Sequence, residues 1–386
     1  MGVAMTCPSC QAIVGESEQF CEACGAGLSP TVPAAEPPPG DEPTLETPVP
    51  DGLSGTASTC QACGGEVAND GYCDTCGARA SRLRDHFSEQ PAAWVAAVCD
   101  RGIRHTGNED AVALAADAEP GSRAVLVVCD GVSNTIDSDV ASLAAAQAAR
   151  DILESSRSRG MGTASSLVAA VIARLEAAAD AANEAVLEVT RAAKDVATAD
   201  NPVPGSSMAG SSMADSSASV MTSRANPASC TFVAAVVEQD LLVVGSVGDS
   251  RAYWLPDSGA ATALTVDDSF AQEQISSGVP RAEAEAGPQA HAITRWLGVD
   301  APDHTPTTAT MTLTEPGWLM VCSDGLWNYC SAAPDLATLV KELSATVLQT
   351  SGPSPTAEPL ALAGALVDWA NAQGGQDNIT VALARI

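Results

Sequence analysis

Acidic residues stand beside apolar, strand-like runs at five places in this sequence, either next to the run or one residue away from it. The acidic residues and their runs are Asp130 after 125–129, Asp249 after 241–247, Asp324 after 318–322, Asp377 before 379–383 and Glu109-Asp110 before 111–114. Because strands end at the rim of a sheet, side chains at these positions can converge on one place. Several carboxylates share a small volume only when cations neutralise them. The pattern therefore predicts a site for more than one hard divalent cation.

Length, charge and hydropathy limit the classes of protein to which the chain can belong. Its 386 residues, 46% of them hydrophobic, are enough for one large domain with small appendages. The net charge is −30 and residues 1–78 contain no Lys or Arg, which disfavours nucleic acid as a partner. The sequence contains no uninterrupted apolar run of about 18 residues, so no membrane span is expected. The first residues lack the pattern of a secretory signal, so the expected location is cytoplasmic.

Two cysteine-rich segments near the start of the sequence share one spacing. Each has two Cys-x2-Cys pairs, separated by ten residues in the first segment and by nine in the second. The cysteines are Cys7, Cys10, Cys21 and Cys24 in the first segment, and Cys60, Cys63, Cys73 and Cys76 in the second. Both segments closely resemble zinc ribbons, in which four thiolates hold one structural Zn²⁺. So short a piece cannot bury a core, and the metal would supply its folding energy.

Disulfide pairing and a redox Cys-x-x-Cys site are the alternatives for these cysteines. Both are disfavoured, because the expected location is reducing and a redox site needs no duplicated quartet. Either each ribbon closes its own zinc site or the two ribbons exchange pairs. One or two zinc ions are therefore expected.

The order of the segments predicts several parts of different character. They are a zinc ribbon at 1–28, a disordered Pro/Glu-rich linker at 29–58, a second ribbon at 59–80 and a large domain at 84–386 with a low-complexity loop at 199–228. In the large domain, helical patterns cover 140–155, 165–196 and 360–372, and strand patterns cover 231–237, 241–247 and 379–385. Strand pairs followed by helix pairs favour an α+β sandwich over a doubly wound parallel sheet.

Taken in order, the acidic motifs resemble those of the metal-dependent protein phosphatases, the type-2C Ser/Thr phosphatases of the bacterial type. The matching segments are 100–104 (DRGIR), 108–110 (NED), 130–131 (DG), 248–253 (GDSRAY), 264–269 (LTVDDS), 323–326 (SDGL) and 377–381 (DNITV). Each motif alone is weak, but the full set in family order is specific. The resemblance spans residues 92–386. It implies an α-β-β-α sandwich, in which two packed antiparallel sheets are flanked by helices.

The resemblance also implies a role for each acidic residue around two or three Mn²⁺ or Mg²⁺ ions. Asp130 would bridge two ions, and the carbonyl of Gly131 would bind one of them. Asp324 and Asp377 would hold the other ion, and Asp249 would join Asp324 at a third, weaker site. Glu109 and Asp110 would lie beside the second metal, directly or through water. Arg104 would bind the phosphate of the substrate.

The implied activity is hydrolysis of phosphoserine and phosphothreonine in proteins, within bacterial Ser/Thr phosphorylation signalling. Oxygen ligands suit Mg²⁺ or Mn²⁺ rather than structural zinc. A water shared by two such ions has a lowered pKa and serves as the nucleophile, so no covalent phospho-enzyme is needed. The expected partners are phosphoprotein substrates of Ser/Thr protein kinases.

The sequence departs from the family pattern at three positions. His105 stands where the phosphate-binding arginine is usual, and Arg104 lies one residue earlier, so either residue is a candidate for the phosphate contact. Val132-Ser133-Asn134 replaces a glycine-rich stretch, and no histidine follows Asp130-Gly131 as a general acid. Asp268 stands where the family often has histidine. Residues 267–298 resemble the flap beside the active site, where substrate choice would be governed.

A second hypothesis is a catalytically weak or inactive phosphatase-like scaffold that binds partners through its zinc ribbons. The altered loop and the displaced arginine motivate it. The retained aspartates argue against it, because a protein without the metals has no chemical reason to keep mutually repelling carboxylates. In either case the ribbons are expected to dock a protein partner or to support oligomerisation.

Overall fold

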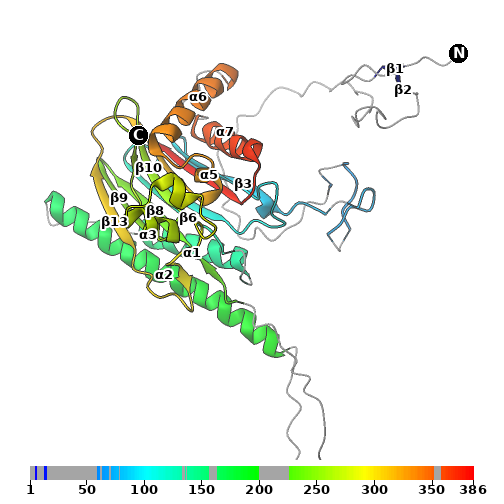
Figure 1. Ribbon diagram of the computed structural model, residues 1–386, viewed down its shortest axis with the longest axis horizontal. Helices are drawn as coiled ribbons and strands as arrows, with labels where there is room; N and C mark the ends of the chain where they lie inside the picture. Colours follow the sequence, from blue (N-terminus) through cyan, green and yellow to red (C-terminus); the bar gives the residue numbers. More distant parts are fainter. Residues whose placement is uncertain are drawn as a thin grey trace, which may run out of the picture. The chain divides into compact units, whose positions relative to one another are not determined.

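Two antiparallel sheets, one of six strands and one of five, form the centre of the fold (Figure 1). The computed structural model describes residues 5–6, 13–14, 59–60, 63–68, 71–77, 79–132, 135, 137–155, 163–199, 226–351 and 358–386. By its internal contacts the chain divides into two units, Met1–Glu46 and Thr47–Ile386. The first unit contains a two-stranded pairing of β1 (Met5–Thr6) with β2 (Ile13–Val14). All of the larger elements belong to the second unit.

The six-stranded sheet has the order β11-β10-β14-β15-β4-β3, and every neighbouring pair is antiparallel. Its strands are β3 (His86–Ala92), β4 (Val95–Asp100), β10 (Arg251–Pro256), β11 (Thr262–Ala263), β14 (Gly317–Cys322) and β15 (Ile379–Arg385). The central strand β15 follows all the others in the sequence. This sheet is therefore complete only when the last strand has inserted between β14 and β4.

The five-stranded sheet has the order β13-β9-β8-β6-β5 and is also antiparallel. Its strands are β5 (Ala111–Ala116), β6 (Arg123–Cys129), β8 (Phe232–Glu238), β9 (Leu241–Val247) and β13 (Thr307–Thr312). A separate short pair joins β7 (Ser229–Cys230) to β12 (Leu297–Gly298). The strands expected at 231–237 and 241–247 are confirmed as β8 and β9, which pair with each other as a hairpin.

Helices cover the outer face of each sheet (Figure 1). Long helices α1 and α2 pack on the five-stranded sheet, and α6 and α7 lie on the six-stranded sheet. The helices are η1 (Leu83–Asp85), α1 (Ser138–Ser155), α2 (Ala164–Ala199), α3 (Phe270–Ser276), α4 (Arg281–Glu285), α5 (Asp324–Trp327), α6 (Ala333–Ser351) and α7 (Glu358–Gln373). The predicted α-β-β-α sandwich is thus confirmed.

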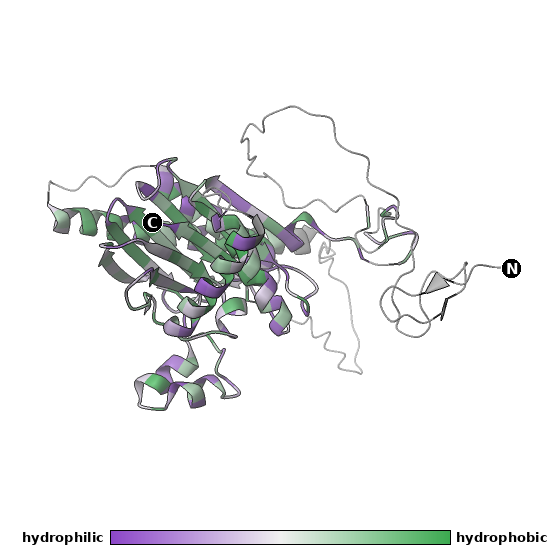
Figure 2. Ribbon diagram, turned by 90° about the horizontal axis from the view of Figure 1, so that it is seen from above, coloured by the Kyte–Doolittle hydropathy of each residue, from purple (hydrophilic) through white to green (hydrophobic). Residues whose placement is uncertain are grey.

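The alternation of side chains along each strand explains why these runs are apolar throughout. In β6, Val125 and Val127 face α1 and α2, whereas Leu126 and Val128 face the other sheet. In β14, Leu319 faces the sheet interface while its neighbours face α6 and α7. Successive residues of a strand point to opposite faces, so a strand covered on both sides has no polar face. Figure 2 shows this hydrophobic interior along the strands.

Some predictions fall where the structure offers no description. The four cysteines of the first ribbon (Cys7, Cys10, Cys21 and Cys24), the linker at 29–58 and most of the loop at 199–228 lie outside the described residues. The predicted helix 165–196 is α2, which extends to Ala199. No helix among the described residues is long and apolar enough to cross a membrane.

Candidate metal centre

The acidic residues meet at one rim, where strands of both sheets end. Asp130 follows β6 and Asp249 follows β9 in one sheet, while Asp324 follows β14 and Asp377 precedes β15 in the other. Asp110 leads into β5. The charges of all four other aspartates act on Asp130, which places the five carboxylates in one electrostatic cluster. The convergence expected from the strand-end pattern is therefore present.

Crowding changes the protonation of these carboxylates. Desolvation by the surrounding protein, followed by the charges of Asp110 and Asp324, raises the pKa of Asp130 well above its ordinary value. Burial and the charges of Asp377 and Asp249 do the same to the pKa of Asp324, whose side chain is buried. Like charges at close range disfavour joint ionisation. The cluster therefore holds its full negative charge only when cations are bound.

Asp110 and Asp249 are the two most enclosed members of the cluster. Burial raises the pKa of Asp110 to about 6, although hydrogen bonds from Ser323 and Thr380 oppose this rise. Both hydroxyls donate to Oδ2 of Asp110, at 2.6 and 2.8 Å. Burial, and then the charge of Asp267, raises the pKa of Asp249 to about 7. Ser323 and Thr380 thus fix the direction of the Asp110 carboxylate from the opposite sheet.

Three buried carboxylate oxygens of the acidic centre have no hydrogen-bond partner among the described residues. They are Oε2 of Glu109, Oδ1 of Asp110 and Oδ1 of Asp324. A buried polar atom without a partner is costly unless an ion or water meets it. The carboxylates are spaced more widely than a compact ligand set, since among the described residues only four cysteines gather their ligand atoms within 4.8 Å. Mg²⁺ and Mn²⁺ fit this arrangement, because such ions retain several waters and take few carboxylates.

Two glycines let backbone segments approach at the centre. Gly131 donates its N–H to the carbonyl of Glu109 at 3.2 Å, and a Cβ at Gly131 would lie 2.7 Å from that oxygen. A Cβ at Gly325 would lie 2.0 Å from the carbonyl oxygen of Asn378. Any larger residue at either position would push the Asp130 or the Asp324 segment away from its neighbour. The Asp-Gly pairs in the sequence therefore have a steric cause.

Asn378 joins the Asp377 segment to the loop that carries Glu109. Its Nδ2 donates to the carbonyls of Arg101 and Gly107, at 2.8 and 3.0 Å. Its Oδ1 accepts the N–H of Glu109 at 2.7 Å. One buried amide side chain thus fixes both ends of the loop against the start of β15. Sequence reasoning had assigned no role to this residue, although it lies within the Asp-Asn motif.

The two candidates for the phosphate contact have different surroundings. Nε2 of His105 lies 3.2 Å from Oδ1 of Asp377, so the imidazole is already engaged with a candidate metal ligand. Arg104 is exposed, and its backbone N–H donates to the carbonyl of Gly375 at 3.0 Å. Within the described part of the chain, its guanidinium has no recorded hydrogen bond or ion pair. The guanidinium of Arg104 is therefore the freer of the two groups.

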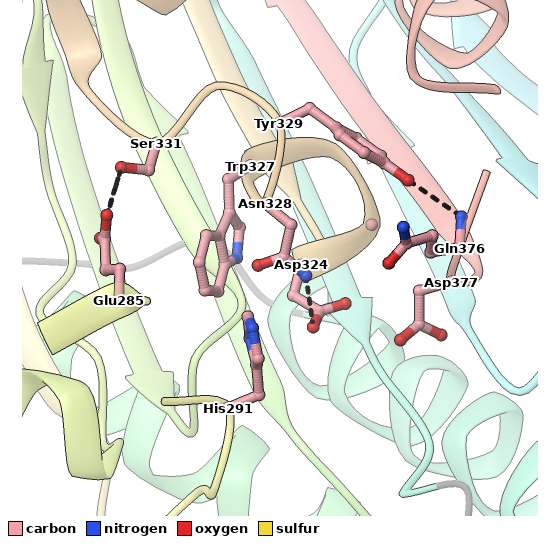
Figure 3. A pocket seen from close by; sticks show the side chains of 10 residues that line it. Glu285, His291, Asp324, Trp327, Asn328, Tyr329, Ser331, Gln376 and Asp377 are labelled. Atoms are coloured by element: carbon pink, nitrogen blue, oxygen red, sulfur yellow. Dashed lines mark hydrogen bonds between the residues drawn. The ribbon is translucent and has the colours of Figure 1, made fainter. Parts of the chain in front are cut away.

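A cavity of about 430 Å³ opens beside Asp324 and Asp377 (Figure 3). Its lining residues are Glu285, His291, Asp324, Gly325, Trp327, Asn328, Tyr329, Ser331, Gln376 and Asp377. Within it, the Tyr329 hydroxyl accepts the N–H of Gln376 at 3.0 Å. The ring of His291 lies 6.4 Å from that of Trp327, centroid to centroid. A group bound at the acidic centre would have room to extend into this cavity.

The segment 267–298, predicted as a flap, is anchored to the centre by one buried arginine. Arg251 forms a two-point ion pair with Asp267, with N–O distances of 2.6 and 2.9 Å. Its guanidinium also lies over the ring of Trp327, 3.6 Å from the ring centroid. Trp327 in turn donates its Nε1–H to the carbonyl of Asp249 at 2.9 Å. Arg251 therefore links the start of the flap to a candidate ligand.

Asp268, which replaces the family's frequent histidine, has a structural partner of its own. Its carboxylate accepts the N–H of Gly248 at 3.0 Å and pairs with Arg295 at 3.2 Å. Arg295 also pairs with Asp303 at 3.0 Å. The residue thus ties both ends of the flap to the turn before Asp249.

The four cysteines of the second ribbon form a separate candidate metal site. Sulfur–sulfur distances are 3.6 Å for Cys60–Cys76 and 3.4 Å for Cys63–Cys73, and no disulfide joins them. A tetrahedral Zn²⁺ with Zn–S bonds of about 2.3 Å requires sulfurs about 3.8 Å apart. The second ribbon thus brings together its own two pairs, at the spacing that suits zinc.

Hydrogen bonds within the second ribbon shift the pKa values of Cys63 and Cys73 in opposite directions. The N–H of Gly65 lowers the pKa of Cys63, but the neighbouring thiols of Cys76 and Cys73 raise it, to about 12. A backbone hydrogen bond from Cys76 lowers the pKa of Cys73 to about 6. The Cys73 thiolate is therefore readily formed, whereas a metal is needed to draw the proton from Cys63.

Sequence comparison relates the chain to bacterial phosphatases. The protein named serine/threonine phosphatase stp of Listeria innocua is 31% identical over 159 residues, which cover 41% of this chain and 57% of that protein. The stp of Listeria monocytogenes matches with the same identity and coverage. The chain thus spans less than two thirds of the length of these curated relatives.

Structural comparison and the family model give the wider coverage. The crystal structure of the Mycobacterium tuberculosis serine/threonine phosphatase PstP/Ppp has a TM-score of 0.50 and 25% identity, covering 76% of this chain and 97% of that one. The Staphylococcus aureus serine/threonine phosphatase Stp1 shares the fold, with a TM-score of 0.53, 22% identity and coverage of 78% and 95%. The sequence model of protein phosphatase 2C matches residues 102–366. The chain therefore belongs to the protein phosphatase 2C family.

Proposed function

We propose that the protein is a metal-dependent phosphatase that hydrolyses phosphoserine and phosphothreonine in proteins. The observation that carries the proposal is the convergence of five aspartates from two sheets on one rim, with orphaned carboxylate oxygens beside an open cavity. Membership of the protein phosphatase 2C family supports the same activity. Mn²⁺ or Mg²⁺ held there would lower the pKa of a water and stabilise charge on the phosphoryl group.

Each residue of the centre has a proposed role in holding two or three ions. Asp130 would serve as a ligand to two of the ions, the Gly131 carbonyl would bind one of them, and Asp324 and Asp377 would hold the other. Asp249 would join Asp324 at a third, weaker site. Glu109 and Asp110 would lie beside the second metal, directly or through water, and their unpartnered oxygens support this assignment. Ser323 and Thr380 keep the carboxylate of Asp110 aimed by donating to its other oxygen.

Arg104 is the proposed contact for the substrate phosphate. Its exposed guanidinium is not committed to a described partner, whereas His105 is paired with Asp377. Replacing Arg104 with Met should raise KM for a phosphate ester about tenfold, as expected for one charged hydrogen-bonding contact. His105→Gln should change KM less. The reverse order of effects would transfer the role to His105.

Hydrolysis of p-nitrophenyl phosphate and of a phosphothreonine peptide tests the proposal directly. The purified protein should turn over both when Mn²⁺ is added, and EDTA should abolish turnover. Asp130→Ala should be inactive at every Mn²⁺ concentration. Activity that persists in EDTA or in Asp130→Ala would overturn the proposal. An inactive wild-type protein that still binds partners would instead favour the scaffold hypothesis.

For the cysteine segments we propose structural zinc sites with a role in docking protein partners. The close approach of the four sulfurs of the second ribbon supports zinc there. The proposed division into two ribbons, a linker and a catalytic domain from residue 84 follows from this. Phosphoproteins made by Ser/Thr protein kinases are the proposed substrates, and nucleic acid is not a proposed partner.

A further inference from the structure

The loop 101–110 carries several of the candidate functional residues on irregular backbone. It connects β4 to β5 and holds Arg104, His105, Glu109 and Asp110. Buried backbone groups outside a helix or sheet need other hydrogen-bond partners. The loop must also resist repulsion between its own carboxylates and those of the rim. Something other than a bound metal must therefore give the loop its shape.

A buried arginine from outside the candidate site reaches this loop. Arg84 lies in η1, immediately before β3, and its side chain is 4% exposed. Its Nε donates to the carbonyl of Asn108 at 2.8 Å, and its Nη2 donates to the carbonyl of Asp110 at 2.9 Å. In return, Nδ2 of Asn108 donates to the carbonyl of Arg84 at 2.9 Å. The two segments are thus joined in both directions.

The carbonyl between these two is reached through a serine of α1. Nη2 of Arg84 donates to Oγ of Ser142 at 2.9 Å, and Ser142 donates to the carbonyl of Glu109 at 2.5 Å. Arg84 thereby fixes three successive carbonyls, those of residues 108, 109 and 110. Orienting three successive peptide units orients the side chains between them, including those of Glu109 and Asp110.

We infer that Arg84 is a positioning residue for the metal centre, holding the Glu109-Asp110 segment in its ligand geometry before any ion arrives. This rests on the proposed function, since it assumes that the acidic centre binds divalent cations. Arg suits the task because its planar fork offers several donors in a fixed geometry and stays charged when buried. Arg84 belongs to none of the acidic motifs identified in the sequence.

The charge of Arg84 and its geometry predict opposite effects on metal affinity. A positive charge near the acidic cluster weakens cation binding, so its loss alone would tighten binding of Mn²⁺. Loss of the three-carbonyl anchor should weaken binding, because changes to residues that orient ligands typically cost about 10–100-fold in affinity. Arg84→Lys keeps the charge and loses the fork, whereas Arg84→Met loses both.

The test measures the Mn²⁺ dissociation constant by calorimetry for the wild-type chain and both variants, together with hydrogen exchange of the amides at 105–111 in metal-free protein. We expect the dissociation constant to rise about 10–100-fold in both variants. Exchange of these amides should quicken in both. At saturating Mn²⁺, KM for p-nitrophenyl phosphate should stay within about twofold of wild type, since the substrate contacts are untouched.

Arg123 provides a matched control within the same domain. It is buried, it donates to the carbonyls of Leu153 and Glu154, and it lies at the far end of the strand β6 that leads to Asp130, roughly 20 Å away. Arg123→Met should lower Tm and leave the Mn²⁺ dissociation constant unchanged. Ser142→Ala removes the link from Arg84 to the carbonyl of Glu109, together with a contact to the carbonyl of Asp139, and leaves the direct bonds of Arg84 to residues 108 and 110 in place. It should raise that constant roughly fivefold, as expected for the loss of one positioning hydrogen bond.

Each outcome decides the inference. A lower Tm with unchanged Mn²⁺ affinity in Arg84→Lys and Ser142→Ala would reduce Arg84 to a structural role like that of Arg123. Tighter binding in Arg84→Met with unchanged binding in Arg84→Lys would assign it a purely electrostatic role. If the wild-type chain binds Mn²⁺ without hydrolysing esters, the proposed function fails, and the exchange and affinity data still decide the role of Arg84.

Discussion

The acidic centre and the second cysteine cluster are both candidate metal sites, but they are built in opposite ways. The acidic residues come from distant parts of the chain, as the bond between Glu109 and Asn378 across 269 positions shows, and the strands of two sheets carry them. The four cysteines fall between positions 60 and 76, where the described backbone forms only isolated bridges. No three carboxylates that the structure describes at the acidic centre bring their oxygens within 4.8 Å of one another, whereas the four sulfurs do.

This difference separates two relations between metal and fold. At the rim, apolar strands and groups such as Asn378 enforce a cluster that is unfavourable without cations, so the fold precedes the metal. In the ribbon, little apolar surface is available and the metal is expected to supply the folding energy. Soft sulfur ligands and hard oxygen ligands keep the two sites chemically distinct.

The largest expected effect is that loss of its metal unfolds the second ribbon, whereas loss of metal leaves the sandwich folded. Cys73→Ser should abolish zinc binding and leave residues 59–77 without protected amides, while Tm of the sandwich changes little. Hydrogen exchange and calorimetry would record both quantities. EDTA treatment of the wild-type centre should leave the sandwich folded. A sandwich that unfolds when only the ribbon loses its metal would show that the two regions are not independent.

A second prediction concerns how far the clustered carboxylates at the rim destabilise the metal-free fold. Asp130→Asn should reduce Mn²⁺-dependent turnover by about a thousandfold, which corresponds to about 4 kcal/mol of transition-state stabilisation. In metal-free protein the same change should raise Tm, because it removes one ionisable carboxyl from a cluster whose members oppose one another's ionisation. Thermal melts with and without Mn²⁺ check both signs. A fall in metal-free Tm would mean that Asp130 stabilises the fold.

The same chemical change at Asp267 should have the opposite sign. Asp267 is paired with the buried Arg251, so Asp267→Asn leaves that cation without its main partner. We expect a loss of about 3 kcal/mol in the free energy of unfolding, as is usual for breaking one side of a buried pair. Urea unfolding measures it, and Mn²⁺ should not restore it. A neutral effect would indicate that Glu285, 3.6 Å from Arg251, replaces the lost charge.

The smallest expected effect concerns Glu89, whose pKa is raised by burial rather than by repulsion from other carboxylates. Glu89 of β3 accepts the N–H of Leu114 at 3.0 Å, and burial raises its pKa from 4.5 to about 7. Because the folded state holds this proton more tightly than the unfolded state, stability falls as pH rises from about 4.5 through 7. The change should be on the order of 2 kcal/mol. Glu89→Gln should flatten the pH dependence of Tm within that window. An unchanged slope would mean that another titrating group causes the pH dependence.

The sequence predicted the parts of the fold that obey a local pattern. Apolar runs covered on both faces defined β6, β9, β14 and β15, and the acidic residues that flank them do converge. It did not predict β3, whose partly exposed edge strand contains Pro91, or β13, whose threonine-rich run has only Ala309 and Met311 as apolar residues. Arg84 left no signal, because its partners lie 24 to 58 positions away and a lone arginine is usually exposed. The pairing of His105 with Asp377 could not be predicted either, because the two residues lie far apart in the sequence.

The central place of β15 in its sheet has a consequence for synthesis. The strands on either side of it are made earlier, and Asp377 and Asn378 directly precede it. Until residue 385 has left the ribosome, β4 and β14 cannot be joined, and the loop at 101–110 lacks its amide anchor. A nascent chain is therefore expected to carry exposed strand edges and no competent centre. The proposed metal centre would be completed only after β15 has been made, and chaperones would protect the exposed strand edges until then.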